Sequence, residues 1–210
     1  MSLADLRQEY RLAGLTEAEA ERDPVRQFER WFQDALDAAV PLANAMTLAT
    51  VTEEGTPDGR VVLLKGIESG GFVFYTNYAS RKGRQLARRP AACLVFFWAA
   101  LERQVRIEGI TEKVAERDSD DYFRSRPLGS RLSAWASQQS DPVPDRGFLE
   151  RALAEMESRF GEQPPRPANW GGYRLVPQAI EFWQGRENRL HDRLLYRRRD
   201  GGWTLERLAP

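Results

Sequence analysis

The sequence predicts a mainly β protein with flanking helices, in which an antiparallel meander closes toward a barrel. Two observations predict this class. From Ala45 onward apolar residues recur with a period of two through five successive segments, and short turns separate these segments. The chain of 210 residues is also long enough to bury roughly 70% of its unfolded surface around a core.

The N-terminal part is predicted to be helical. Residues Asp5–Glu21 indicate a polar helical arm, and Asp23-Pro24 then starts a second helix over Val25–Ala39. The second helix is amphipathic, with apolar residues at intervals of three and four at Phe28, Trp31, Phe32 and Leu36. We expect this apolar face to pack on the sheet.

The five segments of the meander follow in order. Strands are predicted over Ala45–Val51, Arg60–Ile67, Phe72–Asn77, Ala92–Trp98 and Gln104–Val114. A short basic helix, Ser80–Arg89, separates the third strand from the fourth, and Pro90 ends it because proline lacks the N–H that a helix needs.

The second half of the chain is predicted to be helical first and then β. Helices are expected over Ser119–Arg126, Arg131–Ala136 and Arg146–Phe160, followed by a proline-rich link and by strands over Tyr173–Pro177, Ala179–Gln184, Arg193–Arg199 and Trp203–Leu208. Residues 173–210 are too few for an independent core, so we expect them to complete the first sheet. The predicted organisation is an arm or lid over residues 1–22 and one domain over residues 23–210.

Composition excludes several classes of protein. Equal numbers of basic and acidic residues, 31 each, argue against a nucleic-acid or membrane binder, which would carry a basic excess. No apolar stretch is long enough to span a membrane and no secretory signal is present, so a cytoplasmic location is expected. The single cysteine, Cys93, excludes an intrachain disulfide and a multi-cysteine metal site, and no metal is expected.

Arg60–Lys65 is the first candidate anion site. Strand alternation places Arg60, Val62 and Leu64 on one face and Val61, Leu63 and Lys65 on the other, with one cation on each. A cation on a mostly apolar strand needs an anion, which a bound phosphate or an ion pair could supply. The motif alone leaves both open.

Two further segments suit a phosphate. Ser80 is a predicted N-cap, and Arg81 and Lys82 would add positive charge where the helix dipole already favours an anion. Downstream, Tyr122, Arg126 and Ser130 are spaced by four and would point the same way. Each segment also fits a solvated helix surface, and no phosphate-binding glycine loop is present.

The segment Ile180–Arg193 contains the only histidine, His191. If it is extended, Arg189, His191 and Arg193 share one face, and the flanking arginines would lower the pKa of His191 and keep its imidazole neutral. From the residues alone, a structural histidine is the favoured interpretation.

These segments together resemble the pyridoxamine 5'-phosphate oxidase family, from Arg7 to the C-terminal Pro210. The most specific match is the family's C-terminal signature, carried here by Glu181, Phe182, Trp183, Gln184, Gly185, Arg189, Leu190, His191, Asp192 and Arg193. The resemblance implies an FMN-binding split barrel and a homodimer with two FMN molecules at the subunit interface.

The resemblance also implies site residues. FMN contacts would come from Arg60, Val61, Val62, Leu63, Leu64, Lys65, Tyr75, Thr76, Arg81, Lys82, Gln104, Gln139, Ser140, Trp183 and Arg193. Substrate contacts would come from Arg7, Gln8, Glu9, Tyr10, Lys65, Tyr122, Arg126, Ser130, Arg189, Leu190 and His191. Of these, Arg189 and His191 would be catalytic, and residues 7–10 would fold over the bound substrate.

The implied reaction makes pyridoxal 5'-phosphate from pyridoxamine or pyridoxine 5'-phosphate, with hydride transfer from C4' to N5 of FMN and reoxidation by O2 to give H2O2. Arg131 and Ser133 depart from the family pattern, which has glutamine and glycine there. Two rival hypotheses remain: a split-barrel flavoprotein of another activity, and a non-catalytic carrier of pyridoxal 5'-phosphate.

Overall fold

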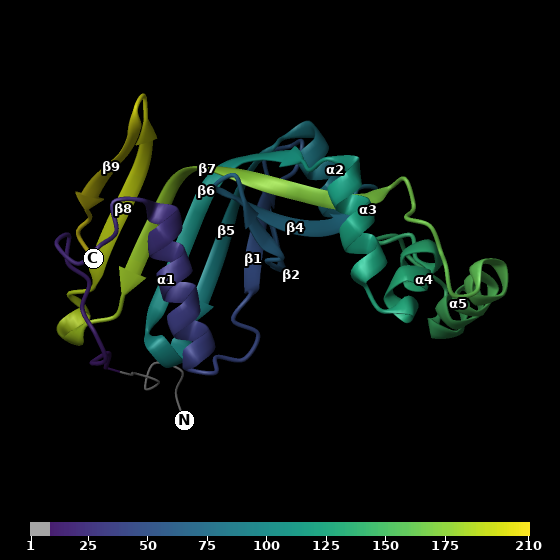
Figure 1. Cartoon of the computed structure of the whole chain (residues 1–210), viewed down its shortest axis with the longest axis horizontal. Coiled ribbons are helices and arrows are strands. Elements are labelled where there is room, and N and C mark those ends of the chain that lie inside the picture. The colour runs from purple at the N-terminus through teal and green to yellow at the C-terminus, as the bar shows by residue number, and fades with distance from the viewer. Residues whose placement is uncertain (1–8) are drawn as a thin grey trace.

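The computed structural model describes residues 9–210, which form one curled antiparallel sheet with helices on its surface (Figure 1). The strands are β1 (Ala45–Val51), β2 (Pro57–Leu63), β3 (Gly66–Glu68), β4 (Gly71–Asn77), β5 (Ala91–Trp98), β6 (Arg103–Lys113), β7 (Trp170–Gln184), β8 (Asp192–Arg199) and β9 (Gly202–Arg207). Their order is β2-β1-β5-β6-β7-β4-β3, and β8 and β9 extend the sheet beyond β7. The predicted mainly β class with flanking helices is confirmed.

Strand β7 joins the two parts of the sheet. The sequence predicted two strands, 173–177 and 179–184, but they form one strand of 15 residues. Its first half pairs with β4 and its second half with β8, while β6 runs beside both. The pairing with β6 shifts between Glu108 and Gly109, so Gln178 has no partner there. Pro177 lies at this bulge, where a residue without an N–H is tolerated.

Helix α1 (Pro24–Asp37) covers the sheet in Figure 1. Its N-cap is Asp23, whose carboxylate accepts the Val25 N–H at 2.8 Å. Phe28 packs against Phe72 of β4 and Phe96 of β5, with ring centroids 4.9 and 5.0 Å apart. This contact closes the core between helix and sheet. Leu36, predicted to lie on the packing face, is half exposed.

The predicted helix over residues 5–21 is wrong for the part that the structure describes, since residues 9–21 contain only turns, bends and irregular chain. Side chains take the backbone donors that a helix would use internally. The Glu102 carboxylate accepts the N–H groups of Arg11 and Leu12 at 2.9 and 3.1 Å, and Asp192 accepts that of Leu15 at 3.0 Å. The arm is therefore held by the body of the protein.

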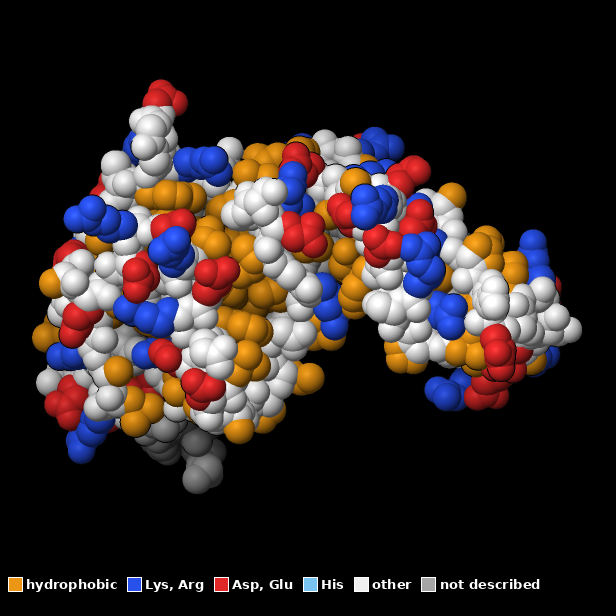
Figure 2. All heavy atoms as spheres, viewed as in Figure 1, with side chains coloured by type: hydrophobic (Ala, Val, Ile, Leu, Met, Phe, Trp, Pro, Cys, Tyr) orange, Lys and Arg blue, Asp and Glu red, His pale blue; other side chains and the backbone are white. Residues whose placement is uncertain are grey.

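The remaining helices are α2 (Arg81–Arg88), α3 (Glu116–Ser125), α4 (Leu128–Ala136) and α5 (Arg146–Phe160), with single 3₁₀ turns at Ala99–Leu101 and Glu187–Arg189. In Figure 1, α4 and α5 project from the sheet beyond α3, and Figure 2 shows the molecule hollowed between this pair and the body. None of the helices in residues 9–210 is long and apolar enough to cross a membrane.

Candidate active site

A cavity of about 570 Å³ opens between strands β2 and β4 and helices α2, α3 and α4. We call it the cationic pocket. Its described lining residues are Arg60, Val61, Val62, Leu63, Lys65, Tyr75, Thr76, Asn77, Lys82, Tyr122, Arg126, Pro127, Ser130, Gln139 and Trp170. Four of them are cations and none of them is a carboxylate. The electrostatic balance of this wall suits an anion.

The start of α2 forms one side of the pocket. Ser80 caps the helix by accepting the Gly83 N–H at 3.2 Å, and Lys82 donates to Gln139 Oε1 at 2.9 Å and to Thr76 Oγ1 at 3.2 Å. Gly83 is required, because a Cβ there would lie 2.3 Å from the Tyr78 carbonyl oxygen. Burial and the nearby Arg60 lower the pKa of Lys82. Within residues 9–210, the hydrogen-bond partners of Lys82 are all neutral, namely Thr76, Ser80 and Gln139.

Arg126 lies on the opposite wall, in the break between α3 and α4. Its guanidinium stacks on the Trp170 ring at 4.6 Å, and its Nη1 is buried with no hydrogen-bond partner in residues 9–210. Burial lowers the pKa of Arg126. Tyr122 and Ser130 line the same pocket, so the predicted common direction of these three residues holds across the helix break. A buried donor without a partner is costly, which indicates a site that an anion completes.

The contacts of Arg60 distinguish between the two alternatives for this strand, a bound phosphate and an ion pair. Its Nη2 lies 2.7 Å from the Asp58 carboxylate, and Arg81 Nε lies 2.9 Å from the same oxygen. Gln85 donates to Asp58 at 2.9 Å and is the largest cause of the lowered pKa of this carboxyl group. The ion-pair alternative is therefore the one that the structure shows for Arg60. The sequence did not predict Asp58 as a site residue, because the predicted strand began at Arg60, whereas β2 begins at Pro57 and places Asp58 on the same face as Arg60.

A second set of predicted residues lies side by side across three strands. Gln104 of β6 pairs in register with Trp183 of β7, and Trp183 pairs with Arg193 of β8. Cross-strand partners share a face of the sheet, so the three side chains form one row. A cavity of about 270 Å³ adjoins the row, and its described lining residues are Val95, Gln104, Arg106, Glu181, Trp183, Arg193 and Pro210.

The prediction that Arg189, His191 and Arg193 share a strand face is wrong. Residues Glu187–Arg189 form a 3₁₀ turn, and β8 starts only at Asp192. Asn188 and Arg189 have positive φ angles of 55° and 60°, which reverse the chain and cannot occur in a strand. Strained backbone of this kind is concentrated at functional sites.

His191 nevertheless lies beside Trp183, with ring centroids 4.6 Å apart, and Tyr10 of the arm contacts both rings at 5.6 and 5.7 Å. We call Tyr10, Gln104, Trp183, His191 and Arg193 the Trp183 cluster. Gly185 allows the approach of the arm, because a Cβ there would lie 2.6 Å from the Tyr10 ring. His191 Nδ1 accepts the Arg186 N–H at 3.1 Å, and burial followed by the charge of Arg189 lowers the pKa of His191. The imidazole is thus held neutral with its proton on Nε2.

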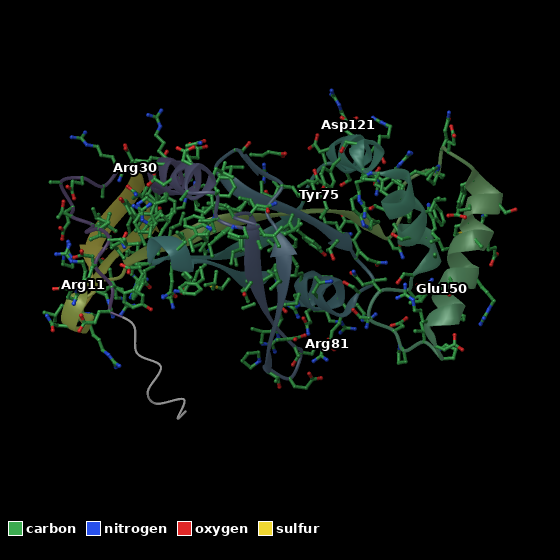
Figure 3. The ribbon with its side chains drawn as sticks, turned by 90° about the horizontal axis from the view of Figure 1, so that it is seen from below. Arg11, Arg30, Tyr75, Arg81, Asp121 and Glu150 are labelled. Atoms are coloured by element: carbon green, nitrogen blue, oxygen red, sulfur yellow. The ribbon has the colours of Figure 1, made fainter. Side chains whose placement is uncertain are left out.

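The cationic pocket and the Trp183 cluster lie at opposite ends of β7. Gly172, the partner of Tyr75, is eleven positions before Trp183. At about 3.3 Å a residue, the path along the strand between them is roughly 36 Å, which is longer than an FMN molecule. Figure 3 shows Arg11, which pairs with Glu187 beside the cluster, at one end of the molecule and Tyr75 and Arg81 near its middle.

Other predicted residues lie outside both groups. Leu64 is buried in the core, Arg81 pairs with Asp58, and Ser140 is exposed with a φ of 80°. The exposed Arg189 makes no ion pair within residues 9–210, and Glu9 pairs with Arg11. Arg131 donates to the Glu162 carbonyl at 3.3 Å, and Ser133 bonds within its own helix. Arg7 and Gln8 lie outside the described residues.

Comparison with known proteins identifies the family to which this chain belongs. Residues 32–160 match the family model described as pyridoxamine 5'-phosphate oxidase, and residues 170–210 match that of the pyridoxine 5'-phosphate oxidase C-terminal dimerisation region. The chain belongs to the pyridoxamine 5'-phosphate oxidase family. It is an oxidoreductase, and its match to the dimerisation region of the family indicates a dimer.

Relatives in the family match over the whole chain. The pyridoxine/pyridoxamine 5'-phosphate oxidases of Ralstonia pickettii and Cupriavidus pinatubonensis are 59% and 58% identical, over 100% and 99% of this chain and 99% of each relative. The solved structure of PhzG from Burkholderia lata, in complex with tetrahydrophenazine-1-carboxylic acid, is 32% identical with a TM-score of 0.89 and covers 95% of this chain and 99% of that one. A pyridoxamine 5'-phosphate oxidase-related, FMN-binding protein from Nostoc punctiforme has a TM-score of 0.72 at 19% identity, over 90% of this chain and 100% of its own, and it shares the fold.

Proposed function

We propose that the protein is an FMN-dependent oxidase that converts pyridoxamine 5'-phosphate and pyridoxine 5'-phosphate to pyridoxal 5'-phosphate, with O2 as electron acceptor and H2O2 as product. The observation that carries the proposal is the cationic pocket, where Arg126 Nη1 is buried and has no hydrogen-bond partner in the described part of the chain. A phosphate oxygen supplies the acceptor that this donor lacks. The full-length identity to named oxidases supports the same substrates.

Two phosphate groups have distinct donors in the cationic pocket. On the α2 side, Lys82 and Thr76 are suited to the phosphate of FMN, together with the Gln139 side chain that already bonds Lys82. On the α3–α4 side, Tyr122, Arg126 and Ser130 are suited to the phosphate of the substrate. Lys65 lines the same pocket and adds a cation to the wall. The two sets fit a cofactor and a substrate bound side by side.

The dimer provides a way to bring the Trp183 cluster to this pocket. Within one chain the two groups are too far apart for a single flavin to contact both, although both carry residues expected to bind it. In a two-fold dimer, a surface of one subunit meets the complementary surface of the other, and each of two equivalent sites can draw on both chains. We therefore assign the cationic pocket of one subunit and the Trp183 cluster of its partner to each site.

In the reaction, bound FMN supplies the two-electron redox chemistry. The protein orients the substrate: Arg126 and its neighbours hold the phosphate at one end of the ring, and Arg189 pins the ring, where its positive charge would stabilise the negative charge that the flavin gains with the hydride. His191 holds its proton at Nε2 and donates from there to a ring substituent, because Nδ1 is engaged by the Arg186 N–H. Tyr10 covers His191 and Trp183 and shields this end of the site from water.

An oxygen-uptake assay tests the proposal. The purified protein with FMN should consume O2 and form H2O2 with either phosphorylated substrate, and pyridoxamine without its phosphate should be a far poorer substrate. A protein that binds FMN yet consumes no O2 with either phosphate ester would refute this function and favour a flavoprotein of another activity. A tricyclic acid of the kind bound by PhzG provides the comparison substrate.

A further inference from the structure

Glu181 is a buried carboxylate on the outer face of β7, and its side chain is only 7% exposed. Its neighbours along the strand, Ile180 and Phe182, point into the core, so alternation turns Glu181 toward the face that carries Trp183. A buried carboxylate is expensive unless its oxygens are bonded. Here each oxygen has its own arginine partner.

The two arginines depend on Glu181 to different degrees. Glu181 Oε1 accepts from Arg193 Nε at 2.7 Å, and Oε2 accepts from Arg106 Nη2 at 2.9 Å. Arg106 also pairs with Glu108 at 3.3 Å. Within residues 9–210, Arg193 has Glu181 as its only carboxylate partner.

Arg193 is fixed at two points. In addition to the Glu181 bond, its Nη1 donates to the Ala209 carbonyl at 2.9 Å, and its own carbonyl accepts the Leu208 N–H at 2.9 Å. The bonds at Nε and Nη1 define the plane of the guanidinium, and within residues 9–210 Nη2 has no hydrogen-bond partner and can serve a ligand. The row that Arg193 ends also offers an amide, Gln104, and an apolar ring, Trp183, which suit the flat polar edge and the face of an isoalloxazine.

We propose that Glu181 is a positioning residue that acts through Arg193 and determines how tightly the isoalloxazine end of the flavin is held. The proposal rests on the proposed function, because it takes FMN as the cofactor. A phosphate-binding residue affects only flavins that carry a phosphate. Glu181, by contrast, should affect FMN and riboflavin equally.

The experiment titrates the full-length, flavin-free protein with FMN and with riboflavin. Glu181→Gln offers one acceptor oxygen for two arginines and turns its amide N–H groups toward the other, so both affinities should fall by about tenfold, or about 1.4 kcal/mol. Glu181→Asp, which keeps the charge, should recover part of the loss. Glu206→Gln is the matched control, because Glu206 pairs with Arg197 in a half-exposed ion pair on the neighbouring hairpin. It should leave both affinities unchanged.

A double-mutant cycle separates positioning from a general loss of structure. In an Arg193→Ala background, Glu181→Gln should produce little further loss of affinity. The same tenfold loss in both backgrounds, or unchanged affinities in Glu181→Gln itself, would overturn the proposal. Failure of the parent protein to bind FMN would instead refute the proposed function, and the two failures are therefore distinguishable.

Discussion

Trp183 on β7 lies directly beside Arg193 on β8, in register and on the sheet face that points away from the core. Their ten-residue separation in sequence contains a reversal of the chain, including the positive φ angles of Asn188 and Arg189. The C-terminal signature of the family therefore folds back on itself. The two residues that we propose for flavin contacts become neighbours on adjacent strands, and the two that we propose for substrate contacts, Arg189 and His191, lie in the turn that joins them.

Subunit complementation should restore activity from two inactive variants. In Arg126→Ala the cationic pocket is damaged, and in Arg193→Ala the Trp183 cluster is damaged. If each site uses one group from each chain, an equal mixture of reassociated chains contains about a quarter of sites with neither substitution. Oxygen uptake should recover to about that fraction of the parent activity. A mixture as inactive as its components would place both groups of a site in one chain.

Lys82→Met should weaken the binding of FMN by about tenfold to a hundredfold, because a charged hydrogen bond to phosphate contributes about 1.5–3 kcal/mol. Riboflavin has no phosphate, so its affinity should not change. Fluorescence titration measures both constants. Lys113→Met is the control, since Lys113 lies over the Tyr78 ring at 4.3 Å and outside the cationic pocket. Equal effects on both flavins would remove Lys82 from the phosphate site.

The pH dependence of kcat/KM should reflect the protonation of His191. Because the pKa of His191 in the folded protein lies below its ordinary value of about 6.5, the imidazole is neutral at pH 7 and protonates only in more acidic solution. Protonation puts a hydrogen on Nδ1 and breaks its bond to the Arg186 N–H. The value of kcat/KM should therefore fall along an acid limb below about pH 6.5.

The same shift makes a prediction for folding. As pH falls from about 6.5, the unfolded chain takes up its proton on His191 first, so the native state loses stability until the folded pKa is passed. His191→Asn should abolish both the acid limb and this part of the pH dependence of unfolding. Persistence of the limb in His191→Asn would assign it to another group.

Gly109→Ala should destabilise the fold by about 1–3 kcal/mol, as expected for overpacking. A Cβ at this position would lie 2.1 Å from the Val176 carbonyl oxygen, at the bulge where β6 meets the middle of β7. At Gly59 on β2, the nearest atom to an added Cβ is 3.9 Å away, so Gly59→Ala is the matched control and should be near neutral. Urea unfolding compares the two. Equal stability of the two variants would mean that the bulge can relax.

Local patterns determined most of the elements of this protein. Period-two alternation located β1, β4, β5 and β6 within about a residue, and Ser80 marked the start of α2, because these signals depend only on neighbouring residues. The predictions that were wrong have the same cause, because local signals do not include contacts with residues far along the chain. The composition of residues 9–21 suggested a polar helix. Instead, the carboxylates of Glu102 and Asp192, which are far along the chain, accept hydrogen bonds from the backbone N–H groups of this segment. Pro177 suggested a strand end, but β7 accommodates it at the bulge that lies opposite Glu108 and Gly109 of β6.

The sequence by itself determined which residue types could bind phosphate and, through its signature, to which family the chain belongs. Only the tertiary structure decided which residues meet: it paired Arg60 with Asp58, buried Arg126 Nη1 with no partner among residues 9–210, and brought Glu181 into contact with Arg193. It also separated the cationic pocket from the Trp183 cluster along one strand. Spacing in a sequence reports neighbours on one element, whereas strand pairing and chain reversal bring together residues that no local pattern relates.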